Sequence, residues 1–188
     1  TTGKVADEQM SAMAMAILLN GMTRREIKDL NCLSAEISPN NQKLLLKVLR
    51  NGQVDVGTYD LRRNRFSPIT QDKSDESEAH WFGNGGDVLY LSDKYTDSIP
   101  VIANKEGLKS VYLWKADDPG ATQRLFTHRG PISNVHAESD SIIYFLAEQS
   151  YGHELVSYHL NSKKFYVNKG RMGAWNSFAI AQDQVVFK

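Results

Sequence analysis

The stretch from Ser38 to Thr70 constrains the fold of this chain more than any other. An apolar run from Lys43 to Leu49 ends at Arg50-Asn51-Gly52, and further strand-forming residues follow this turn. Asn-Gly between two such runs is the strongest short signal for a β-hairpin. A second turn, Arg63-Asn64, leads into a third run from Arg65 to Ile69. The stretch therefore predicts three antiparallel strands joined by tight turns.

The chain repeats this unit. A short strand, a polar turn and an apolar strand recur, and the apolar strands start near Leu44, Val88, Ile142 and Val185, so that they lie 44, 54 and 43 residues apart. An insertion from Asp93 to Gly107 explains the long middle interval. A period of about 40 to 50 residues with four strands is typical of the blades of a β-propeller.

The first unit resembles the TolB-like propeller repeat. Ser38-Pro39-Asn40 stands at its characteristic turn, Tyr59 at its aromatic position and Ile69-Thr70 at its end. Tyr112-Leu113-Trp114 and Arg124 to Thr127 match the same pattern in the second unit. The resemblance implies a mainly β fold of three to four antiparallel meander blades, which is an incomplete β-propeller. Since closed rings usually have more blades, we expect a protein partner or a second subunit to complete the sheet edges.

A helical segment is predicted before the β region. Apolar residues recur at helical spacing behind Asp7, at Met10, Met13, Ala14, Ile17 and Leu18, and predict a helix over residues 7–20. Thr23-Arg24-Arg25-Glu26 has the spacing of a capping box, so a second short helix to about Leu30 is expected. We therefore divide the chain into a helical segment, 1–30, and a propeller-like β domain, 31–188.

These two helices also resemble part of a helix-turn-helix, which leaves a DNA-binding regulator as one alternative. A recognition helix would have to begin at Ser34, where the pattern turns to strand. The chain has 22 basic and 22 acidic residues, so no global field attracts nucleic acid. Nucleic-acid binding is therefore disfavoured. No apolar run reaches the roughly 18 residues of a membrane span, so no transmembrane segment is predicted.

Catalytic chemistry is not indicated by any motif. No Gly-x-Ser-x-Gly elbow occurs, and Cys32, the single cysteine, has no clear histidine partner. The five histidines lack metal-ligand spacing, and His153 and His159 share a face of one predicted strand but lie too far apart to chelate. The acidic segment Gln71 to Glu78 is expected to be a solvated linker, and Gly83 to Gly86 a tight turn. We expect no cofactor, no metal and no catalytic residue.

Binding residues are sought where aromatic and polar side chains gather on the first strands of the units and on their loops. The candidates are Trp81, Tyr95, His128, Arg129, His136 and Trp175. The two tryptophans also fit packing between blades. The insertion around Tyr95 to Ile102 is a further place for a ligand, because long loops often carry binding.

The resemblance favours a non-catalytic binding, sensing or scaffold module of a periplasmic or other extracytoplasmic protein, with a small-molecule ligand as an option. A cytoplasmic location stays open, because the lone cysteine does not decide the compartment. The main alternative is the substrate-gating propeller of a prolyl oligopeptidase-like serine peptidase, with its active site elsewhere. A Gly-x-Ser-x-Gly motif further along the gene would decide for the peptidase, and an upstream transmembrane segment for a sensor.

Overall fold

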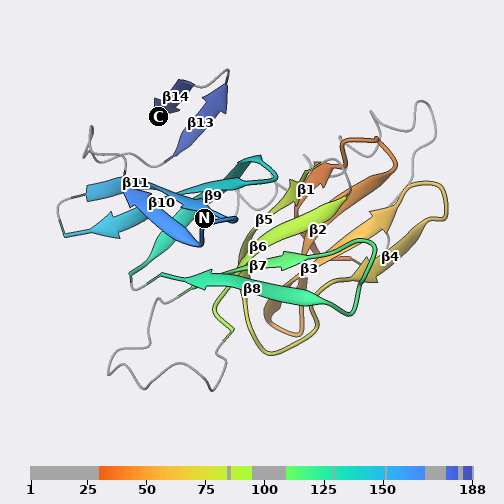
Figure 1. Cartoon of the computed structure of the whole chain (residues 1–188). Coiled ribbons are helices and arrows are strands. Elements are labelled where there is room, and N and C mark those ends of the chain that lie inside the picture. The colour runs from red at the N-terminus through yellow and green to blue at the C-terminus, as the bar shows by residue number, and fades with distance from the viewer. Residues whose placement is uncertain are drawn as a thin grey trace.

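The computed structural model describes residues 30–83, 86–94, 109–128, 130–150, 152–167, 177–181 and 184–187. Every regular element in these ranges is a strand, which confirms the mainly β fold. Three four-stranded antiparallel sheets and one two-stranded pair follow one another along the chain (Figure 1). The helices predicted over residues 7–20 and 23–30 lie outside the described residues, apart from Leu30.

Each sheet is a meander, in which consecutive strands are neighbours. The first sheet contains β1 (Cys32–Ile37), β2 (Lys43–Arg50), β3 (Gln53–Asp60) and β4 (Arg65–Pro68). The second contains β5 (Glu76–Phe82), β6 (Asp87–Ser92), β7 (Ser110–Trp114) and β8 (Thr122–Thr127). The third contains β9 (Ile132–Ser139), β10 (Ile142–Gln149), β11 (Gly152–His159) and β12 (Lys164–Val167). The last pair is β13 (Phe178–Ala181) and β14 (Gln184–Phe187).

The hairpin predicted at Asn51-Gly52 is confirmed. β2 pairs with β3 in a register that sets Arg50 opposite Gln53, which leaves a two-residue loop. Asn51 and Gly52 have φ angles of 52° and 83°, as the two central residues of a type I′ turn require. The second predicted turn is also present, with Asn64 at a φ of 52° just before β4. The sequence thus sets both turns of the first sheet.

The apolar run of β2 is continuous because both faces of the first sheet are buried. Successive side chains of a strand point to opposite faces. Leu44 and Leu46 join a cluster on one face, whereas Leu45 packs with Val56 and Val88 on the other. The second face therefore forms the junction between the first and second sheets.

The second and third sheets share a larger core. Leu89 and Leu91 of β6 join Ile143 and Phe145 of β10 in one cluster. Phe126 of β8 lies 5.3 Å from the ring of Phe145, measured between centroids. Pairs of this geometry contribute about 1 kcal/mol beyond the area that they bury. The sheets thus stack face to face in chain order (Figure 1).

The acidic segment from 71 to 78 is only in part the solvated linker that we expected, because Gln71, Lys73 and Asp75 are exposed between β4 and β5 whereas the end of the segment is part of β5. Glu76 and Glu78 belong to β5, and Glu76 is only 1% exposed. The turn expected at Gly83 to Gly86 joins β5 to β6, and a strand, not a helix, follows it. The insertion that we placed at Asp93 to Gly107 lies largely outside the described residues.

Candidate binding groove between the first two sheets

A groove lies between the first and second sheets. Its volume is about 290 Å³, and it is lined by Ser34, Ala35, Glu36, Leu45, Lys47, Glu78, Ala79 and His80. These residues come from β1, β2 and β5. The groove combines apolar groups with two carboxylates, one lysine and one imidazole, which is the composition of a site that binds through several convergent polar contacts.

Glu36 links β1 to β5 through three hydrogen bonds. Its Oε2 atom lies 3.0 Å from Nδ1 of His80, and its Oε1 atom accepts from the backbone N–H of Trp81 at 3.3 Å. The indole Nε1 of Trp81 donates to the backbone oxygen of Glu36 at 3.1 Å. The side chains of Glu36 and His80 are each 42% exposed, so both keep a surface that a ligand can reach.

Positive charge enters the groove from two strands. The hydrogen bond from Glu36 raises the pKa of His80 above its usual value, because it stabilises the imidazolium form. On β2, Lys47 donates from Nζ to the backbone oxygen of Ser77 at 2.9 Å. Basic and acidic side chains therefore lie close together at this junction, and a ligand can contact charges of either sign.

Glu78 makes the corresponding link from the second sheet to the third. Its Oε1 accepts from the backbone N–H of Asn134 at 2.8 Å, and its Oε2 from that of Val135 at 2.7 Å. Both carboxylates thus link the first strand of one sheet to the first strand of the next, where Glu36 accepts from one backbone N–H and contacts a histidine ring, and Glu78 accepts from two backbone N–H groups. Each carboxylate oxygen has two lone pairs, so each keeps capacity to accept a further hydrogen bond.

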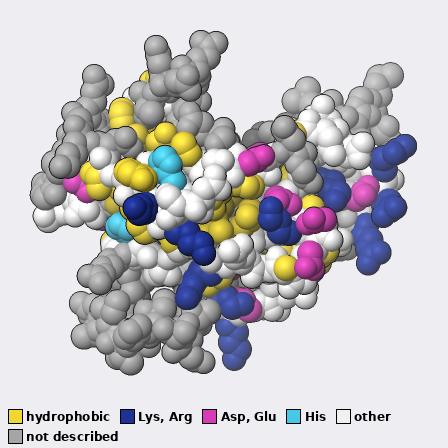
Figure 2. Space-filling view, viewed as in Figure 1, with side chains coloured by type: hydrophobic (Ala, Val, Ile, Leu, Met, Phe, Trp, Pro, Cys, Tyr) yellow, Lys and Arg dark blue, Asp and Glu magenta, His cyan; other side chains and the backbone are white. Residues whose placement is uncertain are grey.

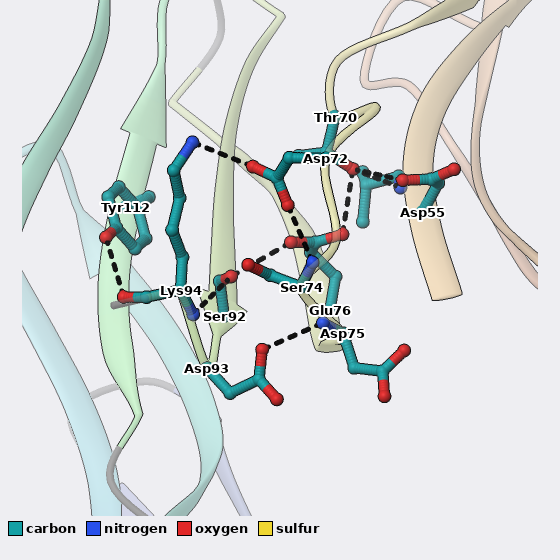
Figure 3. Close-up of polar contacts among 11 residues, drawn as sticks. Asp55, Thr70, Asp72, Ser74, Asp75, Glu76, Ser92, Asp93, Lys94 and Tyr112 are labelled. Atoms are coloured by element: carbon teal, nitrogen blue, oxygen red, sulfur yellow. Dashed lines mark hydrogen bonds and ion pairs between the residues drawn. The ribbon is translucent and has the colours of Figure 1, made fainter. Parts of the chain in front are cut away.

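A second polar cluster surrounds Glu76 at the start of β5 (Figure 3). Glu76 accepts from the hydroxyl of Thr70 at 2.8 Å and from that of Ser92 at 2.9 Å. Burial raises the pKa of Glu76 to about 7. The hydroxyl of Thr70 also accepts from the backbone N–H of Val56 at 2.9 Å and lies 3.4 Å from Asp55. The cluster joins β3, β5 and β6 around one buried carboxyl group.

Around this cluster, the loops are held by further contacts. Lys94 donates from Nζ to Asp72 at 2.7 Å, and its backbone N–H donates to Ser92 (Figure 3). Asp75 accepts from the backbone N–H of Val54, while its own N–H donates to Asp93. Asp72, Asp75 and Asp93 each accept a hydrogen bond. The acidic segment therefore contributes to the junction between the first two sheets.

Nucleophilic and metal chemistry find no support among the described residues. No group of three or more His, Cys, Asp or Glu residues there could hold a metal ion. Cys32 is buried, and burial raises the pKa of its thiol to about 11, so the nucleophilic thiolate is disfavoured. The polar groups that line the groove are suited to hydrogen bonds and to charge contacts.

The candidate residues chosen from the sequence do not gather at one site within the described part of the chain. Trp81 packs at the junction of the first two sheets. His128 lies between the second and third sheets, with its ring 5.5 Å from that of Phe145. His136 lies on β9 and contacts Phe178 of β13, with ring centroids 6.5 Å apart. Tyr95, Arg129 and Trp175, with the insertion 95–102, lie outside the described residues.

Sequence reasoning missed the groove residues Glu36, Lys47 and Glu78 and placed His80 only among the unassigned histidines. Glu36 and His80 are 44 positions apart, and Lys47 and Ser77 are 30 apart. No local motif marks such pairs. The repeat offered one signal, because Glu36 and Glu78 both lie on the first strand of a unit.

Charged side chains are of both signs on the face shown in Figure 2, where basic groups are interspersed with acidic ones over the first sheet. This mixture agrees with equal totals of 22 basic and 22 acidic residues. A one-sign surface of the kind that binds nucleic acid is not present on that part of the described chain. No helix of the described residues is long and apolar enough to cross a membrane.

No protein-family model and no curated protein sequence matches the chain. Solved structures do match. TolB from Acinetobacter baumannii is 20% identical with a TM-score of 0.58, over 79% of this chain and 35% of that one. The tricorn protease is 12% identical with a TM-score of 0.63, over 83% of this chain and 20% of that one. A puromycin hydrolase mutant complexed with PGG is 13% identical with a TM-score of 0.61, over 87% of this chain and 26% of that one.

These likenesses show the fold alone: the chain forms part of a TolB-like β-propeller, as the repeat predicted. It spans about a third of the length of the TolB chain that it matches. The three four-stranded sheets are three propeller blades, and β13 and β14 begin a fourth.

Proposed function

We propose that this chain is a non-catalytic binding module, and that the groove between its first two sheets takes an extended peptide segment of a partner protein. The observation that carries the proposal is the pairing of half-exposed Glu36 and His80 at the edge of a groove of about 290 Å³. Pockets of roughly 300 Å³ or more commonly hold small ligands, so the groove has room for one or two residues of a peptide.

The chemistry of the groove suits a peptide backbone. Peptide N–H groups need acceptors, which the remaining lone pairs of Glu36 and Glu78 supply. Peptide carbonyls need donors, which Lys47 and the imidazole of His80 supply. Leu45, with the two alanines of the lining, gives an apolar wall for small side chains. Among the similar structures are a tricorn protease and a dipeptidyl peptidase, which supports this ligand class.

Fluorescence anisotropy with a fluorescein-labelled pool of random hexapeptides tests the proposal. We expect saturable binding, weakened at least about tenfold by Ser34→Trp, because the indole would fill the groove. Ser67→Trp is the matched control, since Ser67 is exposed on β4 at the opposite edge of the same sheet. Absence of saturable binding, or equal binding by both variants, would overturn the assignment.

The gating propeller of a serine peptidase is the second candidate, because three of the matched structures are a protease, a dipeptidyl peptidase and a hydrolase. A Gly-x-Ser-x-Gly motif further along the full-length gene would favour this function. An upstream transmembrane segment would instead favour an extracytoplasmic sensor, and TolB among the similar structures supports the periplasmic alternative. The sequence of the full gene separates the two.

A protein partner or a second subunit is proposed to complete the last pair of strands. Among the described residues β14 pairs with β13, and Val186 is 59% exposed. A third strand added beside β14 would satisfy its backbone groups by strand addition. The mass of the particle in solution tests a second copy: a mass of one chain at all concentrations excludes it.

A further inference from the structure

The outer strands of the first and third sheets, β4 and β12, are built alike but expose different side chains. Each follows a loop whose last residue has a left-handed backbone, with Asn64 at a φ of 52° and Lys163 at 54°. Each then begins with a basic residue and a phenylalanine. At the next two positions β4 has Ser67-Pro68, whereas β12 has Tyr166-Val167. The repeat therefore has a specific difference at the edge of the third sheet.

The other two edges are poorly suited to a further strand. Pro68 of β4 has no N–H to offer, and proline is one of the residues with which proteins blunt a sheet edge. The outer strand of the second sheet, β8, exposes the polar residues Thr122 and Gln123. β12 contains no proline, and within the described chain it pairs with β11 alone. One row of its backbone N–H and C=O groups therefore has no strand partner there.

One side of β12 is apolar. Successive residues of a strand point to opposite sides, so Phe165 and Val167 share a side. The ring of Phe165 lies 5.2 Å from that of Phe126 and 4.9 Å from that of Tyr158, measured between centroids. This side therefore continues the core shared by the second and third sheets. Phe165 and Val167 nevertheless stay 44% and 47% exposed, which leaves apolar surface for a neighbour.

The other side of β12 presents hydrogen-bond donors. Lys164 and Tyr166 are exposed there, and the ring of Tyr166 lies 4.6 Å from that of His159 on β11. An ammonium group, a phenol and an imidazole can each donate to a carboxylate. This side of the edge therefore suits a strand with acidic side chains.

Positive charge is concentrated in this part of the sequence. Between Glu154 and Asp183 there is no acidic residue, and the basic ones are Lys163, Lys164, Lys169 and Arg171. The whole chain has 22 residues of each sign, so the surplus is local. Complementary charge favours an acidic partner. A second copy of the chain is disfavoured, because pairing β12 with itself would bring two such basic stretches together.

We propose that β12 is a docking edge for an extended acidic segment of a partner protein, which adds to the third sheet as a fifth strand. In strand addition, main-chain hydrogen bonds provide affinity and alternate side chains provide specificity. The added strand places acidic residues beside Lys164 and Tyr166 and apolar residues beside Phe165 and Val167. This edge is separate from the groove, which residues of β1, β2 and β5 line.

Fluorescence anisotropy with two labelled octapeptides tests the proposal. An octapeptide of alternating Glu and Val has acidic residues on one side of a strand and valines on the other, and one of alternating Lys and Val reverses the charge. We expect saturable binding of the acidic peptide and at least about tenfold weaker binding of the basic one. Tyr166→Ser, which gives β12 the residue of β4 at that position, should weaken the acidic peptide at least about tenfold.

Charge reversal gives a matched pair of variants. Lys164→Glu should weaken the acidic peptide and strengthen the basic one, so that the ratio of their affinities changes at least about tenfold. Arg65→Glu changes the equivalent residue of β4 and should leave this ratio unchanged. Hydrogen exchange at Ile143 and Phe145 of β10 should stay slow in all variants, which shows that the third sheet persists. If Tyr166→Ser unfolds that sheet, Lys164→Glu decides.

Several results would overturn the proposal. Absence of saturable binding, or equal affinity for the two peptides, would mean that the edge does not select an acidic strand. Equal effects of Lys164→Glu and Arg65→Glu would place the binding elsewhere, and its loss in Ser34→Trp would place it in the groove. A particle mass that doubles with concentration, and returns to one chain in Tyr166→Ser, would assign the edge to a second copy.

Discussion

The Glu36 carboxylate on β1 lies 3.0 Å from Nδ1 of His80 on β5, so protonation of one imidazole creates an ion pair between two sheets. The hydrogen bond from Glu36 is the largest cause of the raised pKa of His80, and burial opposes it. Both side chains are 42% exposed, which screens the pair and limits its contribution to about 1 kcal/mol or less.

The first prediction concerns the pH dependence of this pair. Because the pKa of folded His80 is raised above 6.5, its stabilisation is complete below about pH 6.5 and is lost as pH rises through the folded pKa. His80→Gln should therefore lower the urea midpoint near pH 6 and leave it unchanged near pH 9. A midpoint lowered equally at both pH values would show that the imidazole acts through packing and not through charge.

Glu76 gives a second, separate pH effect. Its pKa is raised from 4.5 to about 7, mainly by burial, with Asp72 and Asp55 acting in the same direction. The folded chain then holds a proton that the unfolded chain releases, so stability falls as pH rises from about 4.5 to 7. Each pKa unit corresponds to about 1.4 kcal/mol, which gives a loss of up to about 3 kcal/mol.

Glu76→Gln should remove that loss. The amide oxygen can accept from Ser92, and the amide nitrogen can donate to Thr70, whose hydroxyl then turns to Asp55. We expect a higher urea midpoint than that of the unmodified chain above about pH 7, and a flatter profile below it. Glu148→Gln, at an exposed position on β10, should leave the profile as it is. A profile that stays steep in Glu76→Gln would place the titrating group elsewhere.

The local signals of the sequence predicted the fold well. Asn51-Gly52 sets a type I′ turn by its own φ preferences, and the apolar run of β2 marks a strand buried on both faces. Both depend on residues close together in the chain, so no knowledge of the packing was needed. The repeat then extended this result to the other sheets.

The groove could not be predicted in the same way. Glu36 was absent from the candidates, and Glu78 was assigned to a solvated linker, because an acidic residue beside other acidic residues usually lies in water. Its actual partners are the backbone N–H groups of Asn134 and Val135, 56 and 57 positions away. These contacts form only because neighbouring sheets pack against each other, and the sequence of one unit does not show how that unit packs against the next.

A third prediction concerns Gly57 on β3. A Cβ atom there would clash with the ring of Phe66 and lie 2.9 Å from the backbone oxygen of Ser67 on β4. Gly57→Ala should therefore lower the free energy of unfolding by about 1 to 3 kcal/mol, as overpacking does. Gly120→Ala is the control, because a Cβ atom there has no neighbour closer than 3.8 Å. Equal urea midpoints in both variants would mean that Phe66 moves aside without cost.

The last prediction concerns the link from the second sheet to the third. Glu78→Ala would leave the backbone N–H groups of Asn134 and Val135 without their acceptors, at the position where Asn134 already has a φ of 53°. Hydrogen bonds to a charged acceptor contribute about 1.5 to 3 kcal/mol each, and water will replace part of that. We expect a loss of about 2 to 3 kcal/mol in urea unfolding, with faster hydrogen exchange at these two amides.

Glu148→Ala is the matched control for this change, because Glu148 is exposed on β10 and its removal should cost less than about 0.5 kcal/mol. The exchange measurement distinguishes a local from a general effect. If Glu78 holds the second and third sheets together, hydrogen exchange in Glu78→Ala should accelerate at the amides of β9 and stay slow at those of β3 in the first sheet. Uniform acceleration in all three sheets would show instead that Glu78 supports the fold as a whole and not this junction.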